Sequence, residues 1–321
     1  MQLLSSKKTF IRWACPIVFS PDGSLIAWVR GRGVVHVDCT ETLEKRVILQ
    51  FEGEHSPYIM RISYCNRYLV GLQSGAAYLH TIDRVSARLH IGGGKDWFPT
   101  DAAFSPDSQI LALAHEKGIK LWCIATQKFR ISITAYRPYD MVFSHDSLRL
   151  AAVYGINRVN VWASGGDGEV VETIQREDHH HHRANGLVFT RNNELIVGWD
   201  DATLLGKEQY VGPPLLEGTK LLYSVQTGQL IYSGRKIWIW DIERGKYVGE
   251  PFWGGDEERV SVSSKDGTLL KAVAEPKTLK VYSDCRYAVF KFFAAMLCTG
   301  TSLSNGDGDN AILYRILMLL L

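Results

Sequence analysis

The sequence predicts an all-β fold built from repeated antiparallel sheets, and three observations lead to that prediction. Short apolar segments alternate with turn-forming residues along most of the 321 residues. A similar segment recurs roughly every 40 residues, which is a period typical of stacked repeat units. Aromatic residues are frequent, with nine Trp and fourteen Tyr, and several end an apolar segment. Together these features indicate small sheets that pack on one another through their apolar faces.

Each repeat begins with a short strand that ends in a large apolar residue, which we use as its mark. The marks are Phe19, Ile62, Phe104, Phe143, Phe189 and Val262. The steps between them are 43, 42, 39, 46 and 73 residues, and the last step is close to two short units. An apolar residue also stands two positions before each mark, so both side chains lie on one face of a strand. Turn-forming residues follow, as in the Ser-Pro-Asp-Gly sequence at 20–23, where Pro presets φ and Gly tolerates positive φ.

A second and a third strand complete most of each repeat. The second strands are apolar runs, as at 25–29 and 110–114, and a fourth strand follows polar turns, as within 125–133. Four strands per unit, packed radially, predict a β-propeller. Seven third strands are countable, at 34–38, 77–81, 119–123, 159–163, 220–224, 237–241 and 279–283.

The repeat spacing becomes irregular near the sixth unit. Third-strand endings at Trp162 and Tyr223 are 61 residues apart, whereas Trp240 follows Tyr223 after only 17. Four strands of about five residues each cannot fit into that second interval. Pro213 and Pro214 also forbid a central strand in that part of the chain. We therefore expect seven units with unit six truncated, or else two irregular units made from the same residues.

The repeat segments at 19–27, 103–122, 143–162 and 236–251 resemble WD40-repeat proteins, and the resemblance covers residues 10–284. The last of these segments is similar to the regular WD40 arrays of fungal proteins. A Trp-Asp pair ends a third strand once, at Trp240-Asp241, and the buried His, Ser/Thr, Asp and Trp network of that family is incomplete in every unit. The resemblance implies repeat-defining structural positions at Phe19, Phe104, Trp122, Phe143, Trp162, Phe189, Trp240 and Asp241.

The resemblance also implies that the loop entering each unit lies on the face that binds partners. Pro57, Pro99 and Pro138 align in three successive entry loops and stiffen them. Stiff loops rich in aromatic residues suit binding, because Trp, Tyr and Arg dominate interface hot spots. The alternative is that these aromatic side chains pack between loops and bind nothing. The candidate partner-binding residues are His55, Tyr58, Trp97, Tyr136, Tyr139, His182 and Glu258.

Motifs for metal, phosphate or catalytic chemistry lack the spacing that this chemistry needs. Four consecutive histidines within 177–183 point alternately to two sides of a strand, so we interpret the run as a solvated loop. The Gly-rich segment 91–96 lacks the phosphate-loop spacing, and 305–310 lacks the Glu of a calcium loop. The acidic segment 254–259 is interpreted as a solvated cluster, with partner contact as the alternative. We expect no cofactor, no metal and no catalytic residue.

Composition limits the remaining classes. The net charge of +2 argues against a nucleic-acid binder, and six scattered cysteines indicate reduced thiols in an intracellular protein, cytoplasmic or nuclear. The N-terminus lacks the apolar core of a signal peptide, and 311–321 is too short to span a membrane. We divide the chain into a propeller, 1–284, and a tail, 285–321, whose first part could supply the last outer strand.

The leading function hypothesis is a non-catalytic scaffold that presents its entry loops to a protein or peptide. One alternative is the ligand-sensing part of a larger signalling protein. The other is a propeller enzyme or small-ligand binder, with Asp200, Asp201 and Asp256 around a metal in the central channel.

Overall fold

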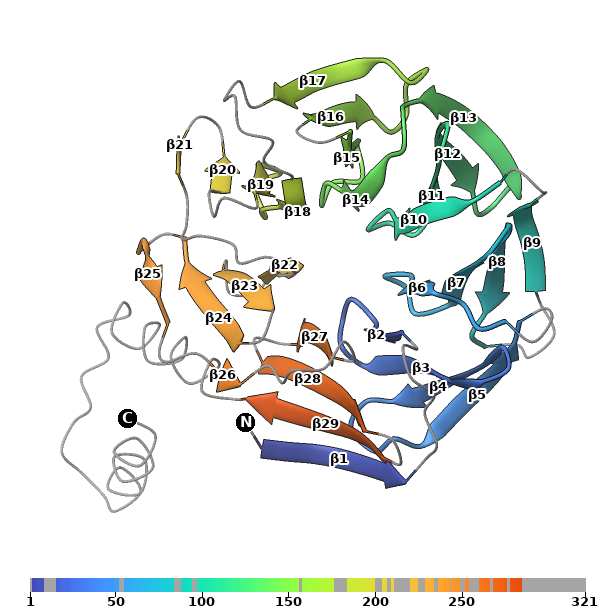
Figure 1. The fold of residues 1–321 in the computed structure, drawn as a ribbon, viewed down its shortest axis with the longest axis vertical. Helices are drawn as coiled ribbons and strands as arrows, with labels where there is room; N and C mark the ends of the chain where they lie inside the picture. Colours follow the sequence, from blue (N-terminus) through green and yellow to red (C-terminus); the bar gives the residue numbers. More distant parts are fainter. Residues whose placement is uncertain are drawn as a thin grey trace, which may run out of the picture.

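Antiparallel sheets are arranged radially in the computed structural model, in a β-propeller-like fold (Figure 1). One edge strand of each sheet lies toward the centre and the opposite edge strand lies at the rim. Neighbouring inner strands contact one another from β27 through β2, β6, β10, β14 and β18 to β22. The structure describes residues 2–8, 16–51, 55–83, 88–93, 97–155, 158–175, 184–199, 204–206, 209–210, 220–224, 229–233, 236–242, 244–248, 252–253, 260–265, 268–275 and 278–284.

Five blades are each formed by four consecutive antiparallel strands. The first contains β2 (Ile17–Phe19), β3 (Leu25–Gly31), β4 (Val34–Cys39) and β5 (Lys45–Gln50). The second contains β6 (Ile59–Ile62), β7 (Tyr68–Gln73), β8 (Ala76–Thr81) and β9 (Arg88–Gly93). The third contains β10 (Pro99–Phe104), β11 (Ile110–His115), β12 (Gly118–Cys123) and β13 (Lys128–Thr134). The fourth contains β14 (Tyr139–Phe143), β15 (Arg149–Tyr154), β16 (Arg158–Ala163) and β17 (Val170–Gln175). The fifth contains β18 (Ala184–Phe189), β19 (Leu195–Trp199), β20 (Leu204–Gly206) and β21 (Gln209–Tyr210).

Two further sheets stand between the fifth blade and the first. One contains β22 (Lys220–Ser224), β23 (Gln229–Ser233), β24 (Lys236–Asp241) and β25 (Lys246–Tyr247), and β26 (Phe252–Trp253) also pairs with β24. The other contains β27 (Val260–Lys265), β28 (Thr268–Glu275), β29 (Thr278–Asp284) and β1 (Gln2–Lys8).

The sixth sheet contradicts the truncated unit and agrees with the alternative of two irregular units made from the same residues. Residues 220–224 are not a third strand but the inner strand β22, which pairs with β23. Tyr223 lies opposite Leu230, just as the mark Phe104 lies opposite Leu111. The third strand of the fifth blade is β20, which has only three residues and no aromatic residue at its end. A search for third strands by their aromatic endings therefore did not find it. The sheet is irregular only at its outer edge, where β25 and β26 are two residues each.

The outer strand of the last sheet comes from the start of the chain. β1 pairs with β29, with Gln2 opposite Ser283 and Lys8 opposite Thr278. The first part of 285–321 was considered as a source of this strand, and among the described residues β1 takes that position. Residues 285–321 lie outside the described residues. The last sheet therefore combines the first strand of the propeller, β1, with its last three strands, β27, β28 and β29.

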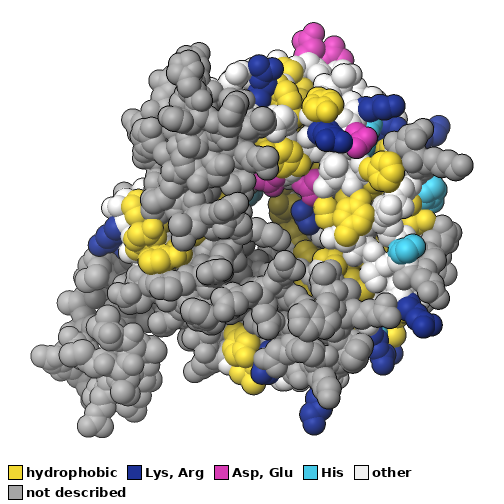
Figure 2. Space-filling view, in the orientation of Figure 1, with side chains coloured by type: hydrophobic (Ala, Val, Ile, Leu, Met, Phe, Trp, Pro, Cys, Tyr) yellow, Lys and Arg dark blue, Asp and Glu magenta, His cyan; other side chains and the backbone are white. Residues whose placement is uncertain are grey.

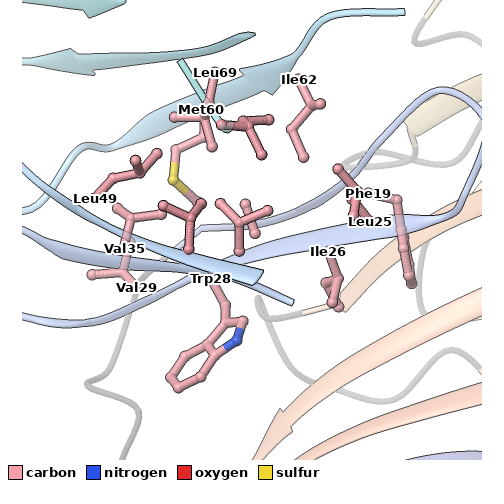
Figure 3. Close-up of a cluster of buried hydrophobic side chains, with 14 of the residues drawn as sticks. Phe19, Leu25, Ile26, Trp28, Val29, Val35, Leu49, Met60, Ile62 and Leu69 are labelled. Atoms are coloured by element: carbon pink, nitrogen blue, oxygen red, sulfur yellow. The ribbon is translucent and has the colours of Figure 1, made fainter. Parts of the chain in front are cut away.

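The pattern of burial explains why the second and third strands are nearly continuous apolar runs. Successive side chains point to opposite faces of a strand, and both faces of a middle strand are covered by neighbouring blades. Five successive residues of β3 are buried, whereas β17 at the rim is mostly exposed. In Figure 3, Met60 and Leu69 approach Leu49 across the junction between the first two blades, and Trp28 points to the other side of its sheet.

Most of the residues assigned to repeat-defining positions are buried. Phe19, Phe104, Phe143 and Phe189 end the inner strands β2, β10, β14 and β18 and are buried. Among the residues that end third strands, Trp122, Trp162 and Asp241 are buried and Trp240 is half-buried. The Asp241 carboxylate accepts a hydrogen bond from the Arg244 backbone N–H at 3.0 Å, so it orders the turn that leads to β25.

A series of hydrogen bonds joins the turns that follow the inner strands of successive blades. The residue four positions after the mark has a left-handed backbone in five of these turns, and in the four where it is not glycine its side chain reaches the turn of the preceding blade. Asn66, with φ of 58°, donates from Nδ2 to Asp22 Oδ2 at 2.7 Å. The other three links are Cys65 N to Ser108 Oγ (3.0 Å), Asp107 N to Ser147 Oγ (3.1 Å) and Asn193 Nδ2 to Asp146 Oδ2 (2.9 Å).

Candidate functional site

The antiparallel topology places two sets of loops on one face of the ring. The loops entering the inner strands share this face with the turns between second and third strands, because each strand reverses the chain direction. We call it the entry face, and we call the opposite face, which carries the turns after the inner strands, the turn face. Contacts confirm the first grouping: the Arg137 backbone N–H in the loop entering the fourth blade donates to the Glu116 carbonyl in the β11–β12 turn.

Three aromatic side chains are exposed on successive loops of the entry face. They are Tyr58, Phe98 and Tyr136, which are 45%, 45% and 71% exposed and precede β6, β10 and β14. We call these residues the aromatic arc. Tyr58 and Tyr136 were predicted, whereas Phe98 was missed because its neighbour Trp97 occupied the aligned position. Exposed aromatic side chains on adjacent loops provide apolar contact area at low entropic cost.

Trp97 does not belong to this exposed set. Its side chain is only 9% exposed and packs in the cluster between the second and third blades. Its ring lies 6.3 Å from that of His115, and Gly92 leaves room for it, since a Cβ there would lie 3.2 Å from Trp97 Cζ2. The repeat spacing correctly predicted that Trp97 lies in an entry loop. Its side chain, however, points into the core and not toward solvent.

Hydrogen bonds between blades hold the entry loops in place. The Tyr58 hydroxyl donates to the Pro99 carbonyl of the next blade, and the Thr100 hydroxyl donates to the Pro138 carbonyl at 2.7 Å. The aligned prolines therefore contribute acceptors as well as stiffness. Partial burial raises the pKa of Tyr58 to about 12, so its hydroxyl keeps the proton that it donates at neutral pH.

Asp101 joins three blades at the inner strands. Its carboxylate accepts from Arg61 Nη2 at 2.8 Å in β6 and from the Met141 backbone N–H at 3.0 Å in β14. That N–H follows a register shift between Tyr139 and Met141, where Asp140 has a left-handed φ of 49°. Asp101 is 5% exposed, so this charge is paired where water is largely excluded. The sequence carried an unused signal, because Asp101 and Asp140 both stand two residues after the aligned prolines.

The exposed edge of the arc combines an aromatic ring with a charged pair. Arg137 is 5.9 Å from the centre of the Tyr136 ring, and its guanidinium lies 3.2 Å from the Glu116 carboxylate. Both members of this pair are largely solvated, so the pair orients the loop more than it stabilises the fold.

The structure describes two of the other four predicted partner-binding residues. His55 is exposed, and its carbonyl accepts a hydrogen bond from the Gln73 side chain. Tyr139 is half-buried against the cluster between the fourth and fifth blades. His182 and Glu258 lie outside the described residues, as do the histidine run at 177–183 and Asp200, Asp201 and Asp256.

Within the described part of the chain, the structure contains no cluster of three or more His, Cys, Asp or Glu side chains placed to bind a metal ion. The same residues include no helix of sufficient length and apolarity to cross a membrane. Comparison with protein-family models gives no match for this chain, and comparison with curated proteins finds no significantly similar sequence.

Proposed function

We propose that the chain is a WD40-type propeller of seven units that acts as a non-catalytic scaffold, with its entry face binding a protein or peptide. The seven-unit, WD40-type interpretation is supported by the regular order of strands within the sheets and by the Trp-Asp ending at Trp240-Asp241. The scaffold interpretation is supported by the hydrogen bonds that join the entry segments of successive blades.

The aromatic arc is the observation that carries this proposal. Three exposed rings on successive loops leave apolar area in contact with water, and hydrogen bonds between blades hold the loops that carry them. A preformed apolar surface of this kind favours association because little conformational entropy is lost on binding. Figure 2 shows one face of the ring, on which hydrophobic side chains gather near a central hollow with charged side chains between them.

Differential affinity capture tests the proposal. The full chain and a Phe98→Ala, Tyr136→Ala variant serve as baits, and bound proteins are quantified by mass spectrometry. Phe129→Ala is the matched control, because Phe129 is an exposed aromatic residue on the outer strand β13. We expect proteins bound by the wild type and by the control to be lost from the double variant, with all three thermal transitions close together. If the double variant captured the same proteins as the wild type, the entry face would not be the binding surface.

A further inference from the structure

The two faces of the ring carry different charges among the described residues. On the entry face, exposed basic side chains lie near the end of β3, in the β3–β4 turn, in the β11–β12 turn, in the loop entering β14 and at the start of β16. They are Arg30, Arg32, Lys117, Arg137 and Arg158. The turn face carries exposed side chains of both signs, with Lys45, Arg67, Lys128, Arg191, Arg244 and Lys246 among the basic ones and Asp22, Glu41, Glu44, Asp83, Asp107, Asp146, Asp167, Glu169 and Glu194 among the acidic ones.

Few acidic side chains balance the basic ones on the entry face. Of the described acidic residues there, Glu116 is paired with Arg137, the buried Asp101 is paired with Arg61, and the half-buried Asp140 lies near the start of β14. Arg30, Arg32 and Lys117 have no ion-pair partner within the described ranges. These three side chains are exposed, so they can contact carboxylates of a bound molecule.

We propose that the entry face binds an acidic peptide segment that also carries apolar side chains. The aromatic arc contacts the apolar side chains, and the surrounding Arg and Lys side chains contact the carboxylates. This inference rests on the proposed function and adds the chemistry of the partner. Complementary charges between exposed groups speed association and set specificity, and they weaken as salt shortens the Debye length from about 10 Å at 0.1 M to about 3 Å at 1 M.

A peptide fits this surface better than a nucleic acid does. Nucleic-acid binding surfaces concentrate Lys and Arg in a continuous patch or stripe that follows phosphates. Here the basic side chains belong to the turns and loops of separate blades, and Figure 2 shows Lys and Arg spread around the visible face. The aromatic arc adds apolar contact area between them, which suits a chain with alternating apolar and acidic side chains.

Selection from a random peptide library displayed on phage tests the inference with the full chain. Selected peptides are synthesised, and their affinities are measured by fluorescence anisotropy against the wild type, an Arg32→Glu, Lys117→Glu variant and Phe98→Ala, Tyr136→Ala. Arg67→Glu on the turn face is the matched charge control. We expect peptides enriched in Asp and Glu, with affinity lowered about tenfold or more by the entry-face charge reversal and by 0.5 M salt, and unchanged by Arg67→Glu.

The outcomes separate the two proposals. Peptides that need Phe98 and Tyr136 but lack acidic enrichment and salt dependence would overturn the acidic-partner inference and leave the scaffold proposal standing. A library that yields no peptide dependent on the aromatic arc would overturn the acidic-peptide inference and count against the entry face as a peptide-binding surface. A labelled single-stranded oligonucleotide that binds more tightly than the selected peptides in 0.15 M salt would also overturn the inference.

Discussion

Lys7 and Asp38 connect the first strand of the chain to the first blade, with Lys7 Nζ 2.7 Å from Asp38 Oδ2. Lys7 belongs to β1, which completes the last sheet, and Asp38 belongs to β4. The same carboxylate oxygen accepts a hydrogen bond from Trp28 Nε1 at 2.9 Å, and Lys7 also donates to the Leu43 carbonyl at 3.0 Å. This pair therefore fastens the sheet that contains β1 and β29 to the neighbouring blade.

Lys7→Met is expected to loosen the closure of the ring. Asp38 is fully buried, so the substitution leaves its charge with Trp28 as its remaining described donor. Removing one partner of a fully buried pair costs about 3 to 5 kcal/mol, and since Lys7 is 28% exposed we expect a loss of about 2 to 3 kcal/mol. Hydrogen exchange should accelerate in residues 2–8 before the rest of the ring. Lys8→Met, at an exposed position of the same strand, is the control, and equal effects of the two variants would contradict this role.

His36 makes the same junction sensitive to acid. Its imidazole stacks on Trp28 with ring centres 4.6 Å apart, and neither ring nitrogen has a hydrogen-bond partner within the described structure. Burial lowers its pKa below the usual 6.5, Asp38 opposes this shift, and the positive charges of Arg30, Lys7 and Lys45 add to it. Just below pH 6.5, His36 therefore binds more protons in the unfolded chain than in the folded protein. Stability from this group is fully present above pH 6.5 and is lost as the pH falls from there through the folded pKa.

Urea unfolding between pH 7.5 and pH 5 measures this effect. We expect the wild-type free energy of unfolding to fall with pH more steeply than that of His36→Phe, which keeps an aromatic ring against Trp28 without a titrating group. His115 also has a pKa lowered by burial and by Lys120 and Lys117, so the difference between the two proteins isolates His36. Parallel pH profiles would show that His36 does not titrate differently on unfolding.

The repeat could be predicted from the sequence because its signals are local. Phe19, Phe104 and Phe143 each precede a turn whose residues have few conformational alternatives, so spacing alone located the inner strands. The sixth sheet could not be assigned in this way. Tyr223 ends an apolar strand with the same composition as a third strand, and only its pairing with Leu230 shows that the strand is an inner one. The outer position of β1 was missed for a similar reason, since its pairing with β29 spans nearly the whole propeller.

The candidate site was partly predictable for a different physical reason. Loop position follows from the repeat, so the entry loops and their aligned prolines were found. The direction of each side chain depends on packing between blades, which the sequence does not encode locally. Trp97 and Phe98 are adjacent, yet one is 9% exposed and the other 45%. The bond from Asp101 to Arg61 likewise joins different repeats and becomes visible only when the blades are placed side by side.

The division between core and surface in this loop leads to the last prediction. Trp97→Ala removes a large buried side chain from the cluster between the second and third blades, and such substitutions cost about 3 to 5 kcal/mol. Tyr136→Ala removes a side chain that is 71% exposed and should change stability by about 0.5 kcal/mol or less. Thermal and urea unfolding of the two variants measure the difference. Because Trp97 also positions the loop that carries Phe98, its substitution should weaken peptide binding only together with stability, whereas Tyr136→Ala should weaken binding alone. If Trp97→Ala were stable but did not bind peptide, Trp97 would have to contact the partner directly. If Tyr136→Ala were unstable, the Tyr136 ring would have to contribute to the core.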